Sequence, residues 1–170
     1  MLKIAKFYKV SVEQFEHDYC ATFPNTTKEE VKEIYDAIRL PKRATTGSAG
    51  YDFFSPLAFD LAPGETIKIP TGIRAQMQPG WVLHLYPRSS LGFKYRLQLN
   101  NTVGIIDSDY FNSDNEGHIF AKITNDSNEN KTVHMNALDG FMQGIFLPFG
   151  IVEDDDVAEI RNGGFGSTNK

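Results

Sequence analysis

One stretch of the sequence combines an amide, a glycine, a carboxylate and an aromatic ring within ten residues. It runs from Asn101 to Tyr110 and has the sequence Asn-Thr-Val-Gly-Ile-Ile-Asp-Ser-Asp-Tyr. The two isoleucines favour extended backbone, and Gly104 permits a turn or a close approach of the backbone to a ligand. We therefore expect a β-hairpin whose second arm ends at Asp107. A carboxylate beside the ring of Tyr110 could act as a general base next to a sugar or a base, although a solvated acid and a core tyrosine would give the same pattern.

Two other stretches place small or hydroxyl-bearing residues next to a charge. Residues 47–52 (Gly-Ser-Ala-Gly-Tyr-Asp) end in an acid that is either a site residue or the cap of a turn. Residues 87–94 (Pro-Arg-Ser-Ser-Leu-Gly-Phe-Lys) follow a predicted strand, and Ser89 or Ser90 would cap a short helix. Amides at a helix start, two hydroxyls and Arg88 have the composition of an anion site. The pattern Gly-x-x-x-x-Gly-Lys-Ser is absent, which excludes a Walker loop.

Two further features are polar groups in unusual surroundings. Gln143 is a single amide inside the apolar run 141–149. A buried glutamine needs hydrogen-bond partners, so Gln143 is either a structural hydrogen bonder or a site residue. The tail, residues 162–170, is rich in glycine and contains one aromatic residue, Phe165. We expect this tail to be flexible until it closes over a ligand, with its ring on a base and its amides on phosphates.

Short strands must position most of these groups. Alternating segments bounded by turn signals predict strands at 2–10, 66–69, 73–77 and 81–86. Residues 118–124 and 131–135 flank a polar turn and are expected to pair as a hairpin. The run 141–149 is expected to form a buried strand. Many short strands at regular spacing predict a β-sandwich or a jelly roll.

The segment from about Ser11 to Arg39 has a helical pattern instead. Thr27 and Glu30 have the spacing of a capping box. The apolar positions that follow at helical spacing are Val31, Ile34, Tyr35 and Ile38. We therefore expect a helical insertion, of about residues 11–39, that packs against the β-core.

Composition narrows the class of function. The 170 residues carry a net charge of −5, with 41% hydrophobic and 23% charged residues, as in ordinary globular domains. An acidic chain is not expected to bind nucleic acid or an anionic membrane surface, and no apolar run reaches membrane-spanning length. The single cysteine, Cys20, fits a reducing compartment, so we expect a cytoplasmic location, or the host cytoplasm if the protein is phage-encoded. The four histidines lack metal-ligand spacing.

Taken in order, these stretches resemble the five sequence motifs of the trimeric dUTP diphosphatases (dUTPases). The matching segments are residues 49–52, 87–90 and 101–110, Gln143, and residues 163–168. The resemblance runs from about Leu40 to the C-terminus. It implies one domain over residues 1–170, with a mainly β fold: a jelly-roll or distorted β-barrel subunit, here with the helical insertion. It also implies a homotrimer whose sites are shared between subunits.

The same resemblance implies the reaction and the role of each residue. The family hydrolyses dUTP to dUMP and pyrophosphate by in-line attack of water on the α-phosphate with Mg²⁺, which keeps uracil out of DNA and supplies dUMP for dTMP synthesis. Asp107 would position and deprotonate the water. Tyr110 would pack under the deoxyribose and leave no room for a 2′-hydroxyl. The uracil edge would meet Asn101 and the backbone of Gly104 and Ile106.

The remaining motifs would hold the phosphates, the metal and the lid. Phosphates or the attacking water would be held by Arg88, Ser89, Ser90 and Gln143, and Gln143 is thereby a second catalytic candidate. Asp52 would bind Mg²⁺ through water. The closing tail would cover the uracil with Phe165 and contact the substrate with Gly166, Ser167 and Thr168.

The sequence departs from the family pattern in three places. Motif five is one residue shorter between Arg161 and Phe165 and ends in Asn169-Lys170 instead of a glycine. Gly140 stands where motif four usually carries an arginine, so the usual ion pair of that arginine is lost or replaced. The segment 11–39 is additional, and we expect it to lie on the outside of the trimer in a peripheral role.

Two alternatives remain: a dCTP deaminase of the same fold, which needs a glutamate base, and a nucleotide-dependent regulatory binding protein that uses the helical segment.

Overall fold

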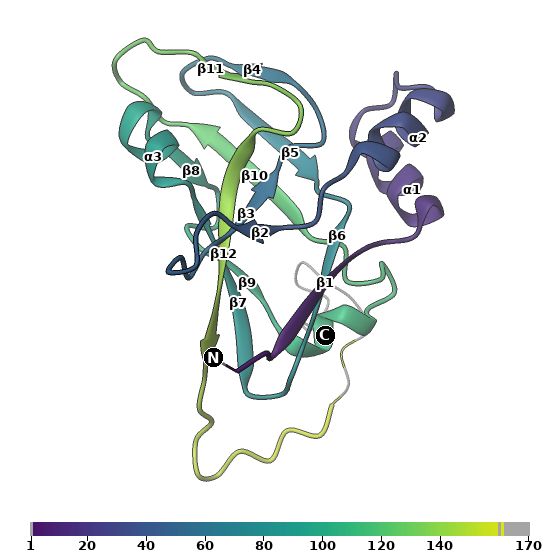
Figure 1. The fold of residues 1–170 in the computed structure, drawn as a ribbon, viewed down its shortest axis with the longest axis vertical. Coiled ribbons are helices and arrows are strands. Elements are labelled where there is room, and N and C mark those ends of the chain that lie inside the picture. The colour runs from purple at the N-terminus through teal and green to yellow at the C-terminus, as the bar shows by residue number, and fades with distance from the viewer. Residues whose placement is uncertain (1, 160, 162–170) are drawn as a thin grey trace.

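The computed structural model describes residues 2–159 and residue 161, and it shows a mainly β domain with helices at its edges (Figure 1). The predicted fold class is confirmed: short antiparallel strands fold around one apolar core, as in a jelly roll. No helix in the described part of the chain is long and apolar enough to cross a membrane.

The strands form four antiparallel groups. The largest sheet has the order β2-β3-β12-β7-β9, comprising β2 (Lys42–Arg43), β3 (Tyr51–Phe54), β12 (Gly140–Pro148), β7 (Trp81–Pro87) and β9 (Gly104–Ile106). The second has the order β5-β10-β8, comprising β5 (Thr66–Pro70), β10 (Phe120–Asn125) and β8 (Leu97–Leu99). Two pairs complete the set: β1 (Ala5–Lys9) with β6 (Ile73–Met77), and β4 (Phe59–Leu61) with β11 (Val133–Met135). The strands predicted at 2–10, 66–69, 73–77 and 81–86 are thus confirmed.

The hairpin predicted between 118–124 and 131–135 is wrong. Strand β10 pairs with β5 and β8, whereas β11 pairs with β4. The physical reason lies in Asn125, a fully buried amide at the end of β10. Its Nδ2 donates to the carbonyl oxygens of Leu61 and Lys131, both at 2.8 Å. These bonds attach the turn to β4, so the returning chain joins that strand instead.

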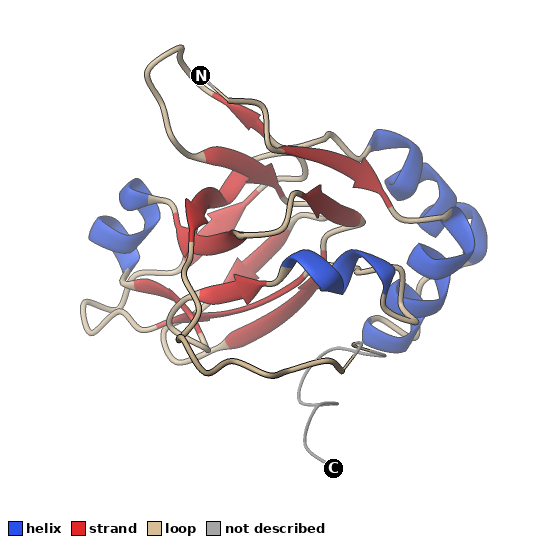
Figure 2. Cartoon of the chain, turned by 90° about the horizontal axis from the view of Figure 1, so that it is seen from below, coloured by secondary structure: helices blue, strands red, loops and turns tan. Residues whose placement is uncertain are grey.

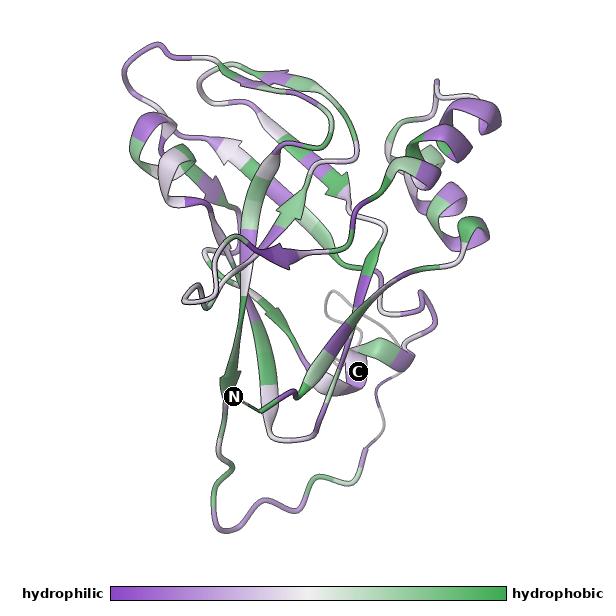
Figure 3. Cartoon of the chain, viewed as in Figure 1, coloured by the Kyte–Doolittle hydropathy of each residue, from purple (hydrophilic) through white to green (hydrophobic). Residues whose placement is uncertain are grey.

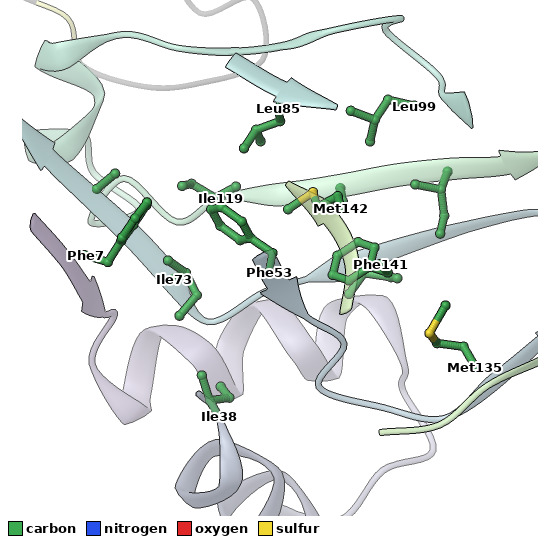
Figure 4. Packing of buried hydrophobic residues seen from close by; sticks show 14 of the residues in the cluster. Phe7, Ile38, Phe53, Ile73, Leu85, Leu99, Ile119, Met135, Phe141 and Met142 are labelled. Atoms are coloured by element: carbon green, nitrogen blue, oxygen red, sulfur yellow. The ribbon is translucent and has the colours of Figure 1, made fainter. Parts of the chain in front are cut away.

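Strand β12 is buried along only part of its length. Phe141 and Met142 are fully buried, but Phe149, just beyond the strand, is 49% exposed. The expectation of a buried strand over 141–149 therefore holds for the first half alone. Figure 4 shows Phe141 and Met142 among the side chains that fill the core.

Two helices form within residues 11–39, where the sequence predicts a helical insertion. They are α1 (Val12–Thr22) and α2 (Lys28–Ala37), and they lie together on one side of the sheets (Figure 2). The capping box is confirmed: the Thr27 side chain accepts from the Glu30 amide, and Glu30 accepts from the Thr27 amide. Helix α1 begins with a cap of its own, in which the Ser11 hydroxyl accepts from the Gln14 amide.

These helices are part of the core. Phe15 and Val31 are fully buried within it, and Ile38 points into it beside the strands (Figure 4). Burial of one such aromatic side chain is worth about 1.5–3 kcal/mol. Hydrophilic and hydrophobic residues share each helix, as expected for helices with one buried stripe (Figure 3). The segment therefore packs against the β-core, as expected, and its place on the outside of a trimer stays a prediction.

Candidate active site

One cavity of about 490 Å³ is lined by all five residues that the sequence singled out in motif three. They are Asn101, Gly104, Ile106, Asp107 and Tyr110. The cavity lies where the turn after β8, strand β9 and strand β10 meet. These residues therefore lie together in the fold, although the backbone around them differs from the expected hairpin.

The predicted hairpin at 101–110 is wrong in its pairing, and this difference creates the cavity. Strand β8 pairs with β10, whereas β9 pairs with β7 in the other sheet. The chain between them turns tightly at Thr102, which has φ of 66° and whose amide donates to the Leu99 carbonyl at 2.8 Å. Because the two arms belong to different sheets, they diverge and leave a space between them.

Gly104 allows β9 to approach β7 closely. A Cβ atom at this position would lie 3.0 Å from the Cβ atom of Leu85, which is tighter than ordinary contact. Strand β9 then carries the chain directly to Asp107, which precedes the 3₁₀ helix η1 (Ser108–Asn112). A single edge strand therefore positions both the cavity wall and the carboxylate.

Asp107 is half exposed and paired with a cation that the sequence analysis did not select. Arg161 forms an ion pair with Asp107, and its Nε lies 3.0 Å from Asp109. The sequence held a signal for this residue: a lone arginine after the acidic run 153–159 and directly before the glycine-rich tail. Arg161 brings positive charge to a cavity in an acidic protein, as an anionic substrate requires.

Tyr110 presents its ring, and not its hydroxyl, to the cavity. The hydroxyl donates to the His118 carbonyl at 2.7 Å and accepts from Asn115 Nδ2 at 2.8 Å. Burial raises the pKa of Tyr110 above its usual value, so the phenol remains neutral at physiological pH. The ring can therefore serve as a flat apolar floor.

A second cluster forms at the other end of β7. Gln143 pairs with Asp52 across β12 and β3, and its Nε2 lies 3.4 Å from the Pro87 carbonyl. Arg88 Nε lies 3.4 Å from Asp52 Oδ1. A Cβ at Gly50 would collide with Gln143 Oε1, so that glycine makes room for the amide.

Gly140 gives Arg88 its place in this cluster. The Arg88 Nη1 donates to the Gly140 carbonyl at 3.2 Å, and a Cβ at Gly140 would lie only 2.7 Å from that nitrogen. The guanidinium of Arg88 thus occupies the space that a side chain at position 140 would need. The same guanidinium pairs with Asp52.

The serines follow Arg88 at the start of α3 (Ser89–Tyr95). The expectation that Ser89 or Ser90 caps this helix is wrong. The cap position falls on Arg88, which makes no capping bond with its side chain, because Ser89 is already the first helical residue. Both serines are exposed, so their hydroxyls face solvent beside Arg88.

The two clusters do not meet within one chain. Continued by one residue, the register Leu83↔Ile106 places Asp107 beside Val82 of β7, and Arg88 follows six residues later, just after the end of β7. At about 3.3 Å per residue, this separates Asp107 from Arg88 by about 20 Å. A catalytic base must lie within about 3 Å of the water that it deprotonates, so both clusters cannot serve one reacting centre in a single chain.

The tail residues and the predicted metal site remain to be considered. Phe165, Gly166, Ser167 and Thr168 lie outside the described residues. Within residues 2–159 and 161, no group of three or more histidine, cysteine or acidic side chains is arranged to hold a metal ion. Asp52 therefore belongs to no such group.

A family model described as dUTPase matches residues 36–169 of this chain. The chain belongs to the dUTPase family. The deoxyuridine 5'-triphosphate nucleotidohydrolase of Lactococcus lactis is 46% identical over 134 residues, which cover 77% of this chain and 88% of that protein. The family match thus begins only at residue 36, near the end of α2.

Solved dUTPase structures share the fold. The crystal structure of the dUTPase from Streptococcus mutans has a TM-score of 0.62 and 36% identity, over 86% of this chain and 98% of that one. A structure of the dUTPase from phage phi11 of Staphylococcus aureus, described with a structural Mg(II) ion, has a TM-score of 0.62. It is 21% identical over 92% of this chain and 98% of that one, so the likeness shows the fold alone. The chain is therefore an enzyme of the dUTP diphosphatase class.

Proposed function

We propose that this dUTPase cleaves dUTP to dUMP and pyrophosphate by in-line attack of water on the α-phosphate. We further propose that it uses Mg²⁺ and that each site is shared between the subunits of a homotrimer. The observation that carries this proposal is the division of the site residues into two clusters on one chain. One cluster has the chemistry to bind a nucleoside, and the other has the chemistry to bind phosphates.

The cavity supports the nucleoside half. Asn101 and the backbone of Gly104 and Ile106 supply hydrogen-bonding groups for the uracil edge, and Tyr110 supplies a floor under the deoxyribose. Asp107 is the general base and holds the attacking water. Carboxylates are weak bases, so the contribution of Asp107 comes mainly from positioning the water.

The second cluster supports the phosphate half. Arg88 supplies a fixed positive charge, and Ser89, Ser90 and Gln143 supply hydrogen bonds to phosphate oxygens or to the water. Phosphoryl transfer depends mostly on positioning and on neutralising the charge that spreads over the phosphate oxygens. These residue types fit that task, and residues 165–168 would complete the contacts as a lid.

The separation of the two clusters supports shared sites. Cyclic symmetry brings different surfaces of identical chains together, so Asp107 of one subunit can meet Arg88 and Gln143 of another. Three copies would then form three equivalent sites.

Asp52 supports the metal through its donor chemistry. Mg²⁺ prefers oxygen ligands and usually keeps several of its waters, so one carboxylate in the phosphate half is sufficient to bind it through water. The ion would neutralise part of the triphosphate charge. The positive charge of the ion would also allow a polyanion to bind to a chain with a net charge of −5.

The deaminase alternative has less support. That chemistry needs a glutamate near the pyrimidine, whereas Asp107 is the only acidic residue among the described residues that line the cavity. The match to the L. lactis nucleotidohydrolase favours the diphosphatase in the same way.

The reaction is tested by measuring pyrophosphate release from dUTP, UTP, dCTP and dTTP, each with Mg²⁺ and with a chelator. We expect release from dUTP alone, and only with the metal. A site that leaves buried polar groups unpaired with the wrong substrate can discriminate by roughly 10⁴-fold. Equal release from UTP, or full activity in the chelator, would contradict the proposed roles of Tyr110 or of Mg²⁺. Ammonia release from dCTP would identify a deaminase.

A further inference from the structure

A buried contact connects helix α1 to the floor of the cavity. His118 is fully buried, and its Nδ1 lies 2.5 Å from a carboxylate oxygen of Asp18 on α1. His118 also packs against Phe15 of the same helix, with ring centroids 6.1 Å apart. The established family match begins at residue 36, so this contact involves a part of the chain that the match does not cover.

The hydrogen-bond partners of His118 fix the orientation of its ring. The Gly72 amide donates to Nε2 at 2.8 Å, so Nε2 must be the acceptor. The proton of a neutral imidazole then lies on Nδ1, which donates to Asp18. Burial raises the pKa of Asp18, but hydrogen bonds from His118, Gln14 and His17 lower it further than burial raises it. Asp18 is therefore a carboxylate at neutral pH and a strong acceptor.

His118 in turn supports two walls of the cavity. Its carbonyl accepts the hydroxyl of Tyr110 at 2.7 Å. Its ring lies against Phe120, with centroids 4.5 Å apart, and Phe120 lines the same cavity. A shift of His118 would therefore move the tyrosine floor and the phenylalanine wall together.

The loop before His118 is held by the same helix. The amide and hydroxyl of Ser11 donate to the Glu116 carboxylate at 2.7 and 2.6 Å. Gly117 has φ of 69°, and a Cβ there would lie 2.6 Å from the carbonyl oxygen of Tyr110. The loop thus packs directly on the backbone of Tyr110, with no room to absorb a displacement.

We propose that Asp18 and His118 are positioning residues for the nucleoside cavity and that helix α1 helps to set its preference for deoxyribose. The proposal rests on the proposed function, in which Tyr110 lies under the sugar. The Asp18 carboxylate fixes the position of the His118 ring, and the His118 carbonyl fixes the position of the Tyr110 ring in the cavity. The space left for a 2′-hydroxyl then depends on a side chain of α1 that does not touch the substrate.

The test compares binding of dUTP and UTP in chelator, where turnover does not interfere, for wild type and three variants. Asp18→Ala removes the acceptor, and Asp18→Asn keeps an oxygen of the same shape that accepts more weakly. Glu13→Ala removes a carboxylate from the exposed side of α1 and is the matched control. Thermal unfolding of each variant measures stability separately.

We expect Asp18→Ala to reduce the dUTP/UTP affinity ratio roughly tenfold, because misplacement by about 1 Å in a site can cost up to about 100-fold. Asp18→Asn should reduce the ratio less, and Glu13→Ala should leave it unchanged. Lower thermal stability with an unchanged ratio in both Asp18 variants would overturn the proposal. If Asp18→Ala does not fold, the ratio in Asp18→Asn decides: a ratio below that of wild type supports the proposal, and a wild-type ratio overturns it.

Failure of the proposed function gives a different result. A wild-type protein that binds dUTP over UTP but releases no pyrophosphate with Mg²⁺ would contradict the reaction, while the affinity ratio would still test Asp18. A wild-type protein that binds both nucleotides equally would overturn the proposal itself, because Tyr110 would then not exclude the 2′-hydroxyl.

Discussion

Substitution of Gly140 by alanine should displace Arg88 without unfolding the domain. The new Cβ would lie 2.7 Å from Arg88 Nη1, which is too close for any non-bonded contact. The atom that must move is the end of a flexible side chain, so movement is easier than a backbone shift. The variant loses the Nη1 bond to the Gly140 carbonyl and disturbs the 3.4 Å pair with Asp52.

The size of the effect follows from these contacts. The side chains of Arg88 and Asp52 are 39% and 21% exposed, so solvent screens their pair, and its loss should cost about 0.2–1 kcal/mol of stability. The effect on catalysis should be larger, because Arg88 would no longer point at the phosphates. Loss of one such contact in the transition state, at about 1.4 kcal/mol, corresponds to a tenfold fall in kcat/KM.

Initial rates of pyrophosphate release from dUTP give kcat/KM for wild type, Gly140→Ala and Gly47→Ala. Gly47 is the matched control, because a Cβ there meets nothing within 4 Å. Arg88→Ala gives the full loss of the guanidinium and should be at least as severe as Gly140→Ala. If Gly140→Ala retains the activity of the Gly47→Ala control, Gly140 does not position Arg88 for catalysis.

Three further predictions concern the base, the tail and acid stability. Asp107→Asn should abolish turnover while dUTP binding, measured by calorimetry, changes little; near-normal turnover would remove Asp107 from the role of base. Deletion of residues 162–170 should reduce activity strongly and leave the unfolding temperature almost unchanged; a fully active truncated enzyme would show that the tail is not a lid. The pKa of Asp18 is lowered in the folded state from an ordinary value of 3.8, so its stabilisation is complete above that value and is lost as the pH falls below it. The difference in unfolding temperature between wild type and Asp18→Asn should therefore be constant above about pH 5 and shrink towards pH 3; a constant difference over the whole range would contradict this reasoning.

Local sequence patterns predicted which segments form helices and strands better than they predicted which strands pair with one another. The capping box at Thr27 and Glu30 and the strand over 81–86 depend on neighbouring residues, and both formed as expected. The pairing of strands depends on contacts far apart in the chain. The amide of Asn125 reaches Leu61, 64 residues away, and no local pattern indicates that contact.

The candidate site shows the same division. Residues 101–110 were predicted to form one site because they are close in the sequence, and five of them line one cavity. The contact of Arg88 with Gly140 joins residues 52 positions apart and became visible only in the structure. The contact of Asp18 with His118 likewise joins residues 100 positions apart. The sequence therefore indicated groups that we propose to touch substrate, but not most of the contacts that hold those groups in place.

The central claim is that Asp107 of one subunit works with Gln143 of another. It is tested most directly by co-expressing Asp107→Asn with Gln143→Ala under two different affinity tags and purifying the mixed assemblies. Each variant alone should be nearly inactive. Each mixed trimer holds two copies of one variant and one of the other, so about one in three of its sites draws an intact Asp107 and an intact Gln143 from two different chains. The account predicts recovery of dUTP hydrolysis to about that fraction of the wild-type rate. Mixed assemblies as inactive as their parents would contradict it, because every chain then carries a defect in its own site.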